Sequence, residues 1–247
     1  MRTHRIEIKR VGGFTLIELL TVVAIIGLLV GMVVPTIKAV LDNSQRMKLL
    51  VRISSLDNGC NQYKMSGTGN RYYPGQDAAG LAALGGTGSP VYPAGSCTNA
   101  GSALLARCLF SRVDPNNSNI IQFPVSNYGN YGTDMLDSTI NPITGVSRSI
   151  IDYANETMAI LYYPSRLASK GVKEQYVIAD NSKYVTATNS AKDSLNAQIT
   201  IQSYVMTTTS SGSTGTSIVR QDGMFVISAA GTDRLYFSTT AVDNFNK

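Results

Sequence analysis

The most regular feature of the hydrophobic pattern is a run of nineteen residues without a charge, from Leu19 to Ile37. As a helix rising about 1.5 Å per residue, this run is roughly 28 Å long and can cross the hydrocarbon core of a bilayer. A single acid, Glu18, stands directly before it. Because a carboxylate is costly in a membrane, its presence here predicts a functional role with a specific partner.

Beyond Pro35 the pattern becomes amphipathic, with apolar residues recurring every three or four positions and charged residues between them. The segment 66–70, Ser-Gly-Thr-Gly-Asn, is typical of a helix end. We therefore predict one N-terminal helix over residues 14–64, of which 14–37 span a membrane. The apolar positions of its second half predict packing beneath a globular head formed by residues 65–247. They are Ile37, Val40, Leu41, Met47, Leu50, Val51, Ile53, Leu56, Cys60 and Tyr63.

The head contains short apolar runs separated by Gly-, Ser- and Pro-rich stretches, which favours an antiparallel sheet with long loops. We expect short helices at Gln76–Leu84 and Ser102–Phe110, and a loop joining two strands at Thr207–Ser217. The fold class predicted from these elements is α+β. The expected strands are Met158–Tyr163, Tyr176–Ala179, Gln198–Met206, Met224–Ser228 and Leu235–Ser238.

The first thirteen residues form a basic leader, with four basic residues against one acid. Positive charge beside the first apolar helix predicts that this end stays in the cytoplasm and that the head is exported. An ordinary secretory signal would be cut after its apolar region at a small-residue site. The sequence after Val34 fits such a site poorly, because Ile37 stands where a small residue is needed. We therefore expect the apolar helix to remain on the mature protein.

The run Gly-Gly-Phe-Thr-Leu-Ile-Glu at residues 12–18, followed by the apolar helix, resembles the prepilin-type leader of type IV pilins and type II secretion pseudopilins. The resemblance implies that prepilin peptidase cleaves between Gly13 and Phe14, removes residues 1–13, and N-methylates Phe14. It also implies that Glu18 pairs with an N-terminal amine, its own or a neighbour's, and so sets the register of assembly. The alternative interpretation is a signal anchor with a chance acid.

Gly27, Gly31 and Pro35 follow one another every four residues in the apolar segment. Small residues at this spacing let membrane helices approach closely, and proline loosens a helix. In filaments of the family that this chain resembles, such a region loses helicity on polymerisation, and the resemblance implies the same here. Ordinary lipid-facing glycines and proline are the alternative.

Three cysteines, Cys60, Cys97 and Cys108, allow three disulfide pairings in an exported head. We predict Cys97–Cys108, because both lie in the loop region of the head. Cys60 is then expected to be a buried, small apolar residue of the long helix.

Tyr72-Tyr73-Pro74 resembles the turn after the long helix of major pseudopilins, and residues 222–233 are similar to the last strand and turn of pseudopilin-like proteins. Major pseudopilins commonly hold calcium in a C-terminal acidic loop, so the resemblance implies a possible calcium site. Asp233 and Asp243 fall near that region, but Arg234 lies beside Asp233 and the chain has no acidic Gly-Asp-Gly run. Calcium prefers six to eight oxygen ligands. We therefore favour turn and cap roles for these two aspartates, keep them as weak calcium candidates, and expect no other cofactor.

Enzymatic chemistry is not expected. The one histidine, His4, lies in the leader, so the mature chain has no histidine for a catalytic triad. No phosphate-binding Gly-Lys-Ser/Thr motif is present. Without the leader the chain holds 17 basic and 15 acidic residues, a balance too weak to imply nucleic-acid binding.

The resemblance implies a structural subunit of a type II secretion pseudopilus. The expected partners are prepilin peptidase, further copies, other pseudopilins and an inner-membrane assembly platform. The head would lie in the periplasm of a bacterium. A type IV pilin for adhesion, twitching motility or DNA uptake is the nearest alternative, and the long, loop-rich head favours it. A single-pass anchored binding domain that never polymerises is the alternative from another class.

Overall fold

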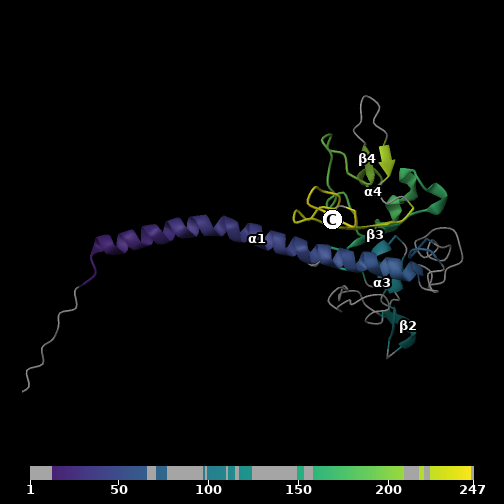
Figure 1. Ribbon diagram of the computed structural model, residues 1–247, viewed down its shortest axis with the longest axis horizontal. Helices are drawn as coiled ribbons and strands as arrows, with labels where there is room; N and C mark the ends of the chain where they lie inside the picture. Colours follow the sequence, from purple (N-terminus) through teal and green to yellow (C-terminus); the bar gives the residue numbers. More distant parts are fainter. Residues whose placement is uncertain are drawn as a thin grey trace, which may run out of the picture. The chain divides into compact units, whose positions relative to one another are not determined.

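The fold was analysed in a computed structural model, which describes residues 13–65, 71–76, 97, 99–109, 111–114, 117–123, 149–152, 158–208, 217–219 and 223–245. The chain divides into two compact units, residues 1–44 and 45–247. A long N-terminal apolar helix and a small antiparallel sheet make this an α+β fold, as the sequence predicts (Figure 1). The predicted leader lies outside the described residues except for Gly13, and so does nearly all of the predicted helix at 76–84, whose first residue, Gln76, is not helical.

Helix α1 runs from Leu16 to Met65 without interruption, one residue beyond the predicted end. Its first part, up to Ser44, belongs to the first unit, and the remainder belongs to the second. The second helix that the sequence predicts is confirmed as α3, Gly101–Leu109. A single-turn helix, α4, covers Ile201–Tyr204.

The main sheet of the second unit has three antiparallel strands in the order β3-β6-β7. Leu161 pairs with Ser228 and Pro164 with Phe225, so the proline stands on an edge strand, where a missing N–H is tolerated. Two further antiparallel pairs are separate from this sheet. Strands of the main sheet are β3 (Leu161–Pro164), β6 (Phe225–Ala229) and β7 (Val242–Asp243); the pairs are β1 (Ser111–Asp114) with β2 (Asn117–Phe123), and β4 (Met206–Thr208) with β5 (Ser217–Val219).

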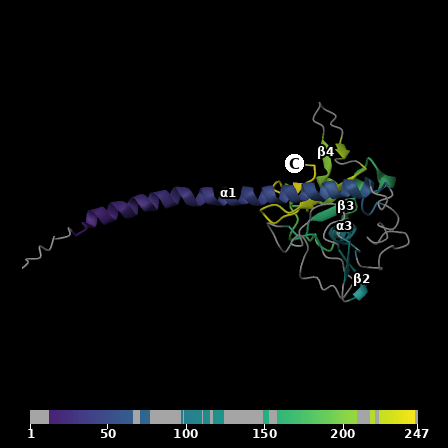
Figure 2. The same cartoon turned by 60° about the horizontal axis from the view of Figure 1, so that its bottom comes forward.

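Successive side chains of the strands point to opposite faces of the main sheet. Both faces are buried, each in its own cluster of apolar residues. One face packs against α1 and α3, and Figures 1 and 2 show the second half of α1 crossing β3. This cluster contains Leu49, Ile53, Leu56 and Cys60 of α1, Leu105, Ala106 and Leu109 of α3, and Tyr162, Phe225, Ile227 and Ala229 of the sheet. The opposite face packs against α4 and the C-terminal segment, with Leu161, Tyr163, Val226, Ile201, Val205 and Phe237.

The strand predicted at Met224–Ser228 is confirmed within one residue as β6, and the one at Met158–Tyr163 is confirmed over its second half as β3. Of the loop predicted at Thr207–Ser217, residues 209–216 lie outside the described residues, and the prediction is wrong at its ends, where Thr207, Thr208 and Ser217 belong to the paired strands β4 and β5. The sequence analysis did not predict β1, β2, β5 or β7, and it predicted only the first residue of β4.

The strand predicted at Tyr176–Ala179 is wrong, because the segment instead lies among three short 3-10 helices. They are η3 (Leu167–Ser169), η4 (Lys173–Gln175) and η5 (Ile178–Asn181). Their backbone bonds are local, as in the bond from Asp180 N–H to the Val177 carbonyl. Two side-chain contacts stabilise the backbone of this segment. Arg166 pairs with Asp180 at 2.6 Å, and the amide of Asn181 donates to the Tyr162 carbonyl. These contacts take the place of the strand pairing that the apolar residues of Tyr176–Ala179 favour.

The strand predicted at Gln198–Met206 is also mostly wrong, because Thr200 begins helix α4. The Thr200 and Ser203 side chains each bond the other residue's backbone N–H, a reciprocal capping arrangement that starts a helix. Leu235–Ser238 is not a strand either. Arg234 and Phe237 have positive φ angles, and Asp233 Oδ1 accepts the Leu235 N–H, so the chain turns there. Only Tyr236 forms an isolated bridge, to Ser190.

Candidate functional site

Two side chains, Thr15 and Glu18, cap the start of α1. The Thr15 backbone N–H and its hydroxyl both donate to Glu18 Oε2 at 2.8 Å. In return, the Glu18 N–H donates to Thr15 Oγ1 at 3.3 Å. This reciprocal pair is a capping box, which satisfies N–H groups that the first helical turn leaves without partners.

The capping box gives Glu18 a fixed position in the first turn of α1. A carboxylate at a helix N-terminus also interacts favourably with the helix dipole. The residue is exposed rather than buried in a core. The sequence analysis predicted a role for Glu18 but missed the contribution of Thr15. The pattern Thr-x-x-Glu before an apolar run was the signal that could have revealed it.

The apolar surface that follows Glu18 is exposed on every side of the helix. The large apolar side chains from Phe14 to Leu41 are between 46 % and 81 % exposed. By length and composition, α1 can cross a membrane, and it is the one helix among the described residues that can. In water such a surface would be unfavourable, so it requires lipid or other apolar helices around it.

Gly27 and Gly31 lie within this exposed part of α1. A Cβ built at either position meets nothing within 4 Å, so the subunit alone gives no packing reason for glycine. The helix is continuous through Pro35. The predicted loosening of this region concerns the polymerised state and stays a prediction.

The cysteines all lie in the core of the second unit. Cys97 and Cys108 share a buried cluster with Ala100, Ala103 and Leu104, and Cys60 belongs to the cluster between α1 and the sheet. Each of the three is present as a thiol, so the predicted Cys97–Cys108 disulfide is not formed in this structure. The prediction that Cys60 is buried is confirmed, and burial raises the pKa of its thiol well above the usual value.

The two weak calcium candidates differ in setting. Asp233 is exposed, and its Oδ1 accepts from the Leu235 N–H and the Ser238 hydroxyl, both at 3.1 Å. Asp243 is buried; its Oδ2 accepts from the Tyr204 hydroxyl at 2.6 Å and its Oδ1 from the Phe245 N–H at 3.0 Å. The described residues contain no cluster of three potential acidic, histidine or cysteine ligands. The contacts of Asp233 form the turn that the sequence analysis favoured, and Asp243 binds the Tyr204 hydroxyl and the Phe245 N–H. Both aspartates stay weak calcium candidates.

The N-terminal segment thus combines a Gly-Phe junction, a capped acid and a helix with an exposed apolar surface. The model of the prokaryotic N-terminal methylation motif matches residues 8–34. The N-terminal part of the chain is therefore similar to the N-terminal segments that carry this motif.

The chain is similar to type II secretion system core protein G from several bacteria. It is 36 % identical to the Escherichia coli protein over 62 residues, which are 25 % of this chain and 41 % of that protein. It is 35 % identical to the Vibrio cholerae protein over 78 residues, 32 % of this chain and 51 % of that protein. The matches thus span about two fifths to one half of these relatives. No solved structure gives a significant match.

Proposed function

We propose that this chain is a structural subunit, a pseudopilin of a type II secretion system, which polymerises through its N-terminal helices to support protein secretion. The observation that carries the proposal is the capped Glu18 at the head of a helix whose apolar surface is exposed throughout its first half. The methylation motif and the similarity to type II secretion system core protein G support it.

Processing begins at the Gly13–Phe14 bond in this proposal. Prepilin peptidase cleaves that bond and N-methylates Phe14. The new N-terminal amine is cationic at neutral pH. It stands four residues before Glu18, at the end of the helix where the carboxylate is already held by Thr15.

Assembly then depends on which cationic group pairs with the Glu18 carboxylate. In the single subunit, Thr15 donates two hydrogen bonds to one oxygen of Glu18. When helices pack into a filament, water around the carboxylate is lost, and an unpaired charge becomes strongly unfavourable. A cationic N-terminus of the subunit itself or of its neighbour removes that penalty only in one stagger of the helices. Glu18 therefore sets the register of the filament.

The subunit is anchored in the bacterial inner membrane before assembly, with its basic leader in the cytoplasm and its head in the periplasm. An assembly platform in that membrane and other pseudopilins are its partners. The subunit is not an enzyme in this proposal, and it takes part in secretion through its stem and head alone. Gly27, Gly31 and Pro35 form the part of the stem that adapts when helices pack.

The first test is mass spectrometry of the native N-terminus in the host. A chain that begins at N-methylated Phe14 supports the proposal, whereas a chain that begins at Met1 contradicts it. Gly13→Leu should retain the leader, because the peptidase must seat extended backbone at that position.

The second test is crosslinking between copies in membranes for the Glu18→Ala variant. We expect normal membrane insertion and strongly reduced crosslinked ladders. Glu174→Ala, which removes an exposed acid of the head, is the matched control and should polymerise as the wild type does. Normal ladders in Glu18→Ala would contradict the role given to Glu18, whereas the absence of ladders in the wild type would favour an anchored domain that never polymerises. Fibres on the cell surface, rather than within the envelope, would favour a type IV pilin.

A further inference from the structure

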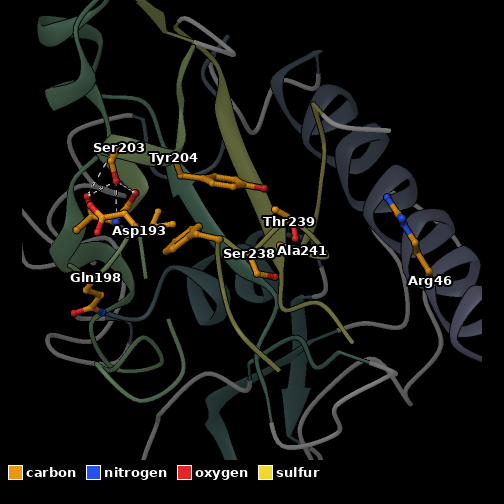
Figure 3. Close-up of a pocket in the computed structure, with 11 residues that line it drawn as sticks. Arg46, Asp193, Gln198, Ser203, Tyr204, Ser238, Thr239 and Ala241 are labelled. Carbon is orange, nitrogen blue, oxygen red and sulfur yellow. Dashed lines mark hydrogen bonds between the residues drawn. The ribbon is translucent and has the colours of Figure 1, made fainter. Parts of the chain in front are cut away.

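A pocket of about 820 Å³ lies in the second unit, away from the residues that the proposed function uses. Its walls come from the segment 193–200, helix α4, the segment 237–241 and Arg46 of α1. Figure 3 shows Asp193, Gln198 and Ser203 gathered on one side, Tyr204 in the middle and Arg46 on the helix opposite. Its volume is in the range of small-molecule sites.

The apolar part of the pocket is a pair of aromatic rings in fixed positions. The rings of Tyr204 and Phe237 lie 5.2 Å apart between centroids at an interplanar angle of 47°. The Tyr204 hydroxyl is tied to Asp243 Oδ2 at 2.6 Å, and Phe237 is only 2 % exposed. Because its orientation is already set by this bond, the Tyr204 ring would lose little side-chain freedom on binding a ligand.

One wall of the pocket is a rigid turn that presents hydrogen-bond acceptors. Asp193 Oδ1 accepts the backbone N–H groups of Leu195 at 2.9 Å and Ala197 at 2.8 Å, which holds the turn closed. Its other oxygen, Oδ2, accepts no hydrogen bond from the described part of the chain. Gln198 donates its amide N–H to the Thr186 carbonyl at 3.2 Å, which fixes its orientation and leaves its side-chain oxygen as an acceptor.

The opposite wall carries a cation. Arg46 is exposed, and among the residues that the structure describes none forms an ion pair with it. Its guanidinium can bind a carboxylate through two parallel hydrogen bonds. The pocket therefore joins one cation, acceptors on the far side, and aromatic rings between them.

This combination fits a sugar that carries a carboxylate. A sugar ring has an apolar face of C–H groups, which suits an aromatic side chain, and a rim of hydroxyls, which donate to oxygens such as Asp193 Oδ2 and the Gln198 carbonyl. A carboxylate substituent suits Arg46. A peptide C-terminus would also suit Arg46 but would bring few donors to the acceptors of the opposite wall. We propose that the pocket binds an acidic saccharide.

Such a saccharide has two sources in a bacterial envelope, the glycan of the cell wall and an exported polysaccharide, and the experiment separates them. Full-length protein in detergent micelles is titrated with a cell-wall disaccharide containing N-acetylmuramic acid, with a tetramer of galacturonic acid, and with neutral cellotetraose. Binding is measured by calorimetry and by saturation transfer to the sugar protons. We expect one of the acidic sugars to bind, and the neutral tetramer to bind about tenfold more weakly or not at all.

The decisive variant is Arg46→Gln, with Lys48→Gln as its matched control two residues along the same exposed stretch of α1. Arg46→Gln should weaken binding of the acidic sugar about tenfold and leave thermal unfolding unchanged, whereas Lys48→Gln should alter neither. The proposal is overturned if neither acidic sugar binds at about 10 mM, a concentration that detects even very weak ligands. Equal affinity in Arg46→Gln and wild type, or binding of a short peptide in place of the sugars, overturns it as well. Filament assembly does not enter this experiment, so its outcome is independent of the proposed function.

Discussion

The two halves of helix α1 are continuous in backbone but lie in different surroundings. In the first half, the large apolar side chains from Phe14 to Leu41 are exposed on all sides of the helix. In the second half, Leu49, Ile53, Leu56 and Cys60 are at most 2 % exposed, while Met47 and Val51 are 61 % and 68 % exposed. The second half thus buries one stripe within its own chain, and the first half buries none. The prediction that the apolar positions from Ile37 onward pack beneath the head is therefore wrong for five of them, which are exposed: Ile37, Val40, Leu41, Met47 and Val51.

The difference follows from how apolar residues are arranged around the helix. A helix that is apolar on every face needs a partner on every face, which lipid or a bundle of other helices can supply. A helix with one apolar stripe needs only one partner, and here the sheet and α3 provide it. Stability of the subunit should therefore depend on the second half, and assembly on the first.

The largest expected effect is on Leu56, which packs against α3 and the sheet and is fully buried. Leu56→Ala should lower the free energy of unfolding by about 2 to 5 kcal/mol, because it leaves a cavity. Val51→Ala, on the exposed side of the same helix, should change it by about 0.5 kcal/mol at most. Urea unfolding of the full chain in detergent would measure both. Similar losses in the two variants would mean that the stripe is not what holds α1 to the head.

The second prediction contrasts one buried carboxylate of the head, Asp180, with the exposed Glu18. Asp180 is 2 % exposed; burial raises its pKa from the usual 3.8 to about 6, although Arg166 at 2.6 Å opposes the rise. A raised pKa in the folded state means that the folded state binds the proton more tightly than the unfolded state. The contribution to stability is therefore complete below pH 4 and is lost as pH rises through 6.

The pH dependence can be measured as the free energy of unfolding between pH 4 and pH 7. We expect a loss of up to about 3 kcal/mol in the wild type, reached near pH 7. In Asp180→Asn this slope should flatten. A slope that stays in Asp180→Asn but disappears in Glu18→Gln would place the titrating group in the stem instead.

The third prediction compares a glycine in each half of the molecule. At Gly101 of α3, a Cβ would collide with the backbone carbonyl oxygen of Tyr162 and crowd the Asn181 amide. Gly101→Ala should therefore cost about 1 to 3 kcal/mol, measured by the same urea unfolding. At Gly27 a Cβ meets nothing, so Gly27→Ala should leave unfolding of the head unchanged. A loss of crosslinked ladders in Gly27→Ala would show that this glycine serves contacts between subunits.

The smallest effect is expected at the helix start. Thr15→Ala removes the side chain of the capping box and should cost about 1 kcal/mol locally, seen as faster amide hydrogen exchange in residues 16–19. Unfolding of the head should not change. Thr15→Ser keeps the hydroxyl and is the control. If exchange is as slow in Thr15→Ala as in Thr15→Ser, the capping hydroxyl does not stabilise this end of α1.

Sequence reasoning succeeded where the determinants are close together in the chain. The bounds of α1 and α3 follow from hydrophobic spacing and from the residues that end a helix, and β6 follows from a short β-branched run between turn residues. It failed at residues 176–179 and 198–206, where apolar residues resemble those of strands. There the Arg166–Asp180 pair and the Thr200 cap favour short helices instead.

The sequence by itself determined the stem: the length of α1, its fully apolar first half, and Glu18 three residues after Thr15. These features need only contacts within one helical turn and the sum of side-chain hydrophobicity. Only the tertiary structure decided which residues of the head meet. The Tyr162 hydroxyl donates to the Pro74 carbonyl 88 positions away, and Arg52 to the Ile151 carbonyl 99 positions away. The pocket between Arg46 and Asp193 likewise unites residues from three distant segments. These long-range contacts depend on the packing of the whole head, which no local sequence pattern encodes.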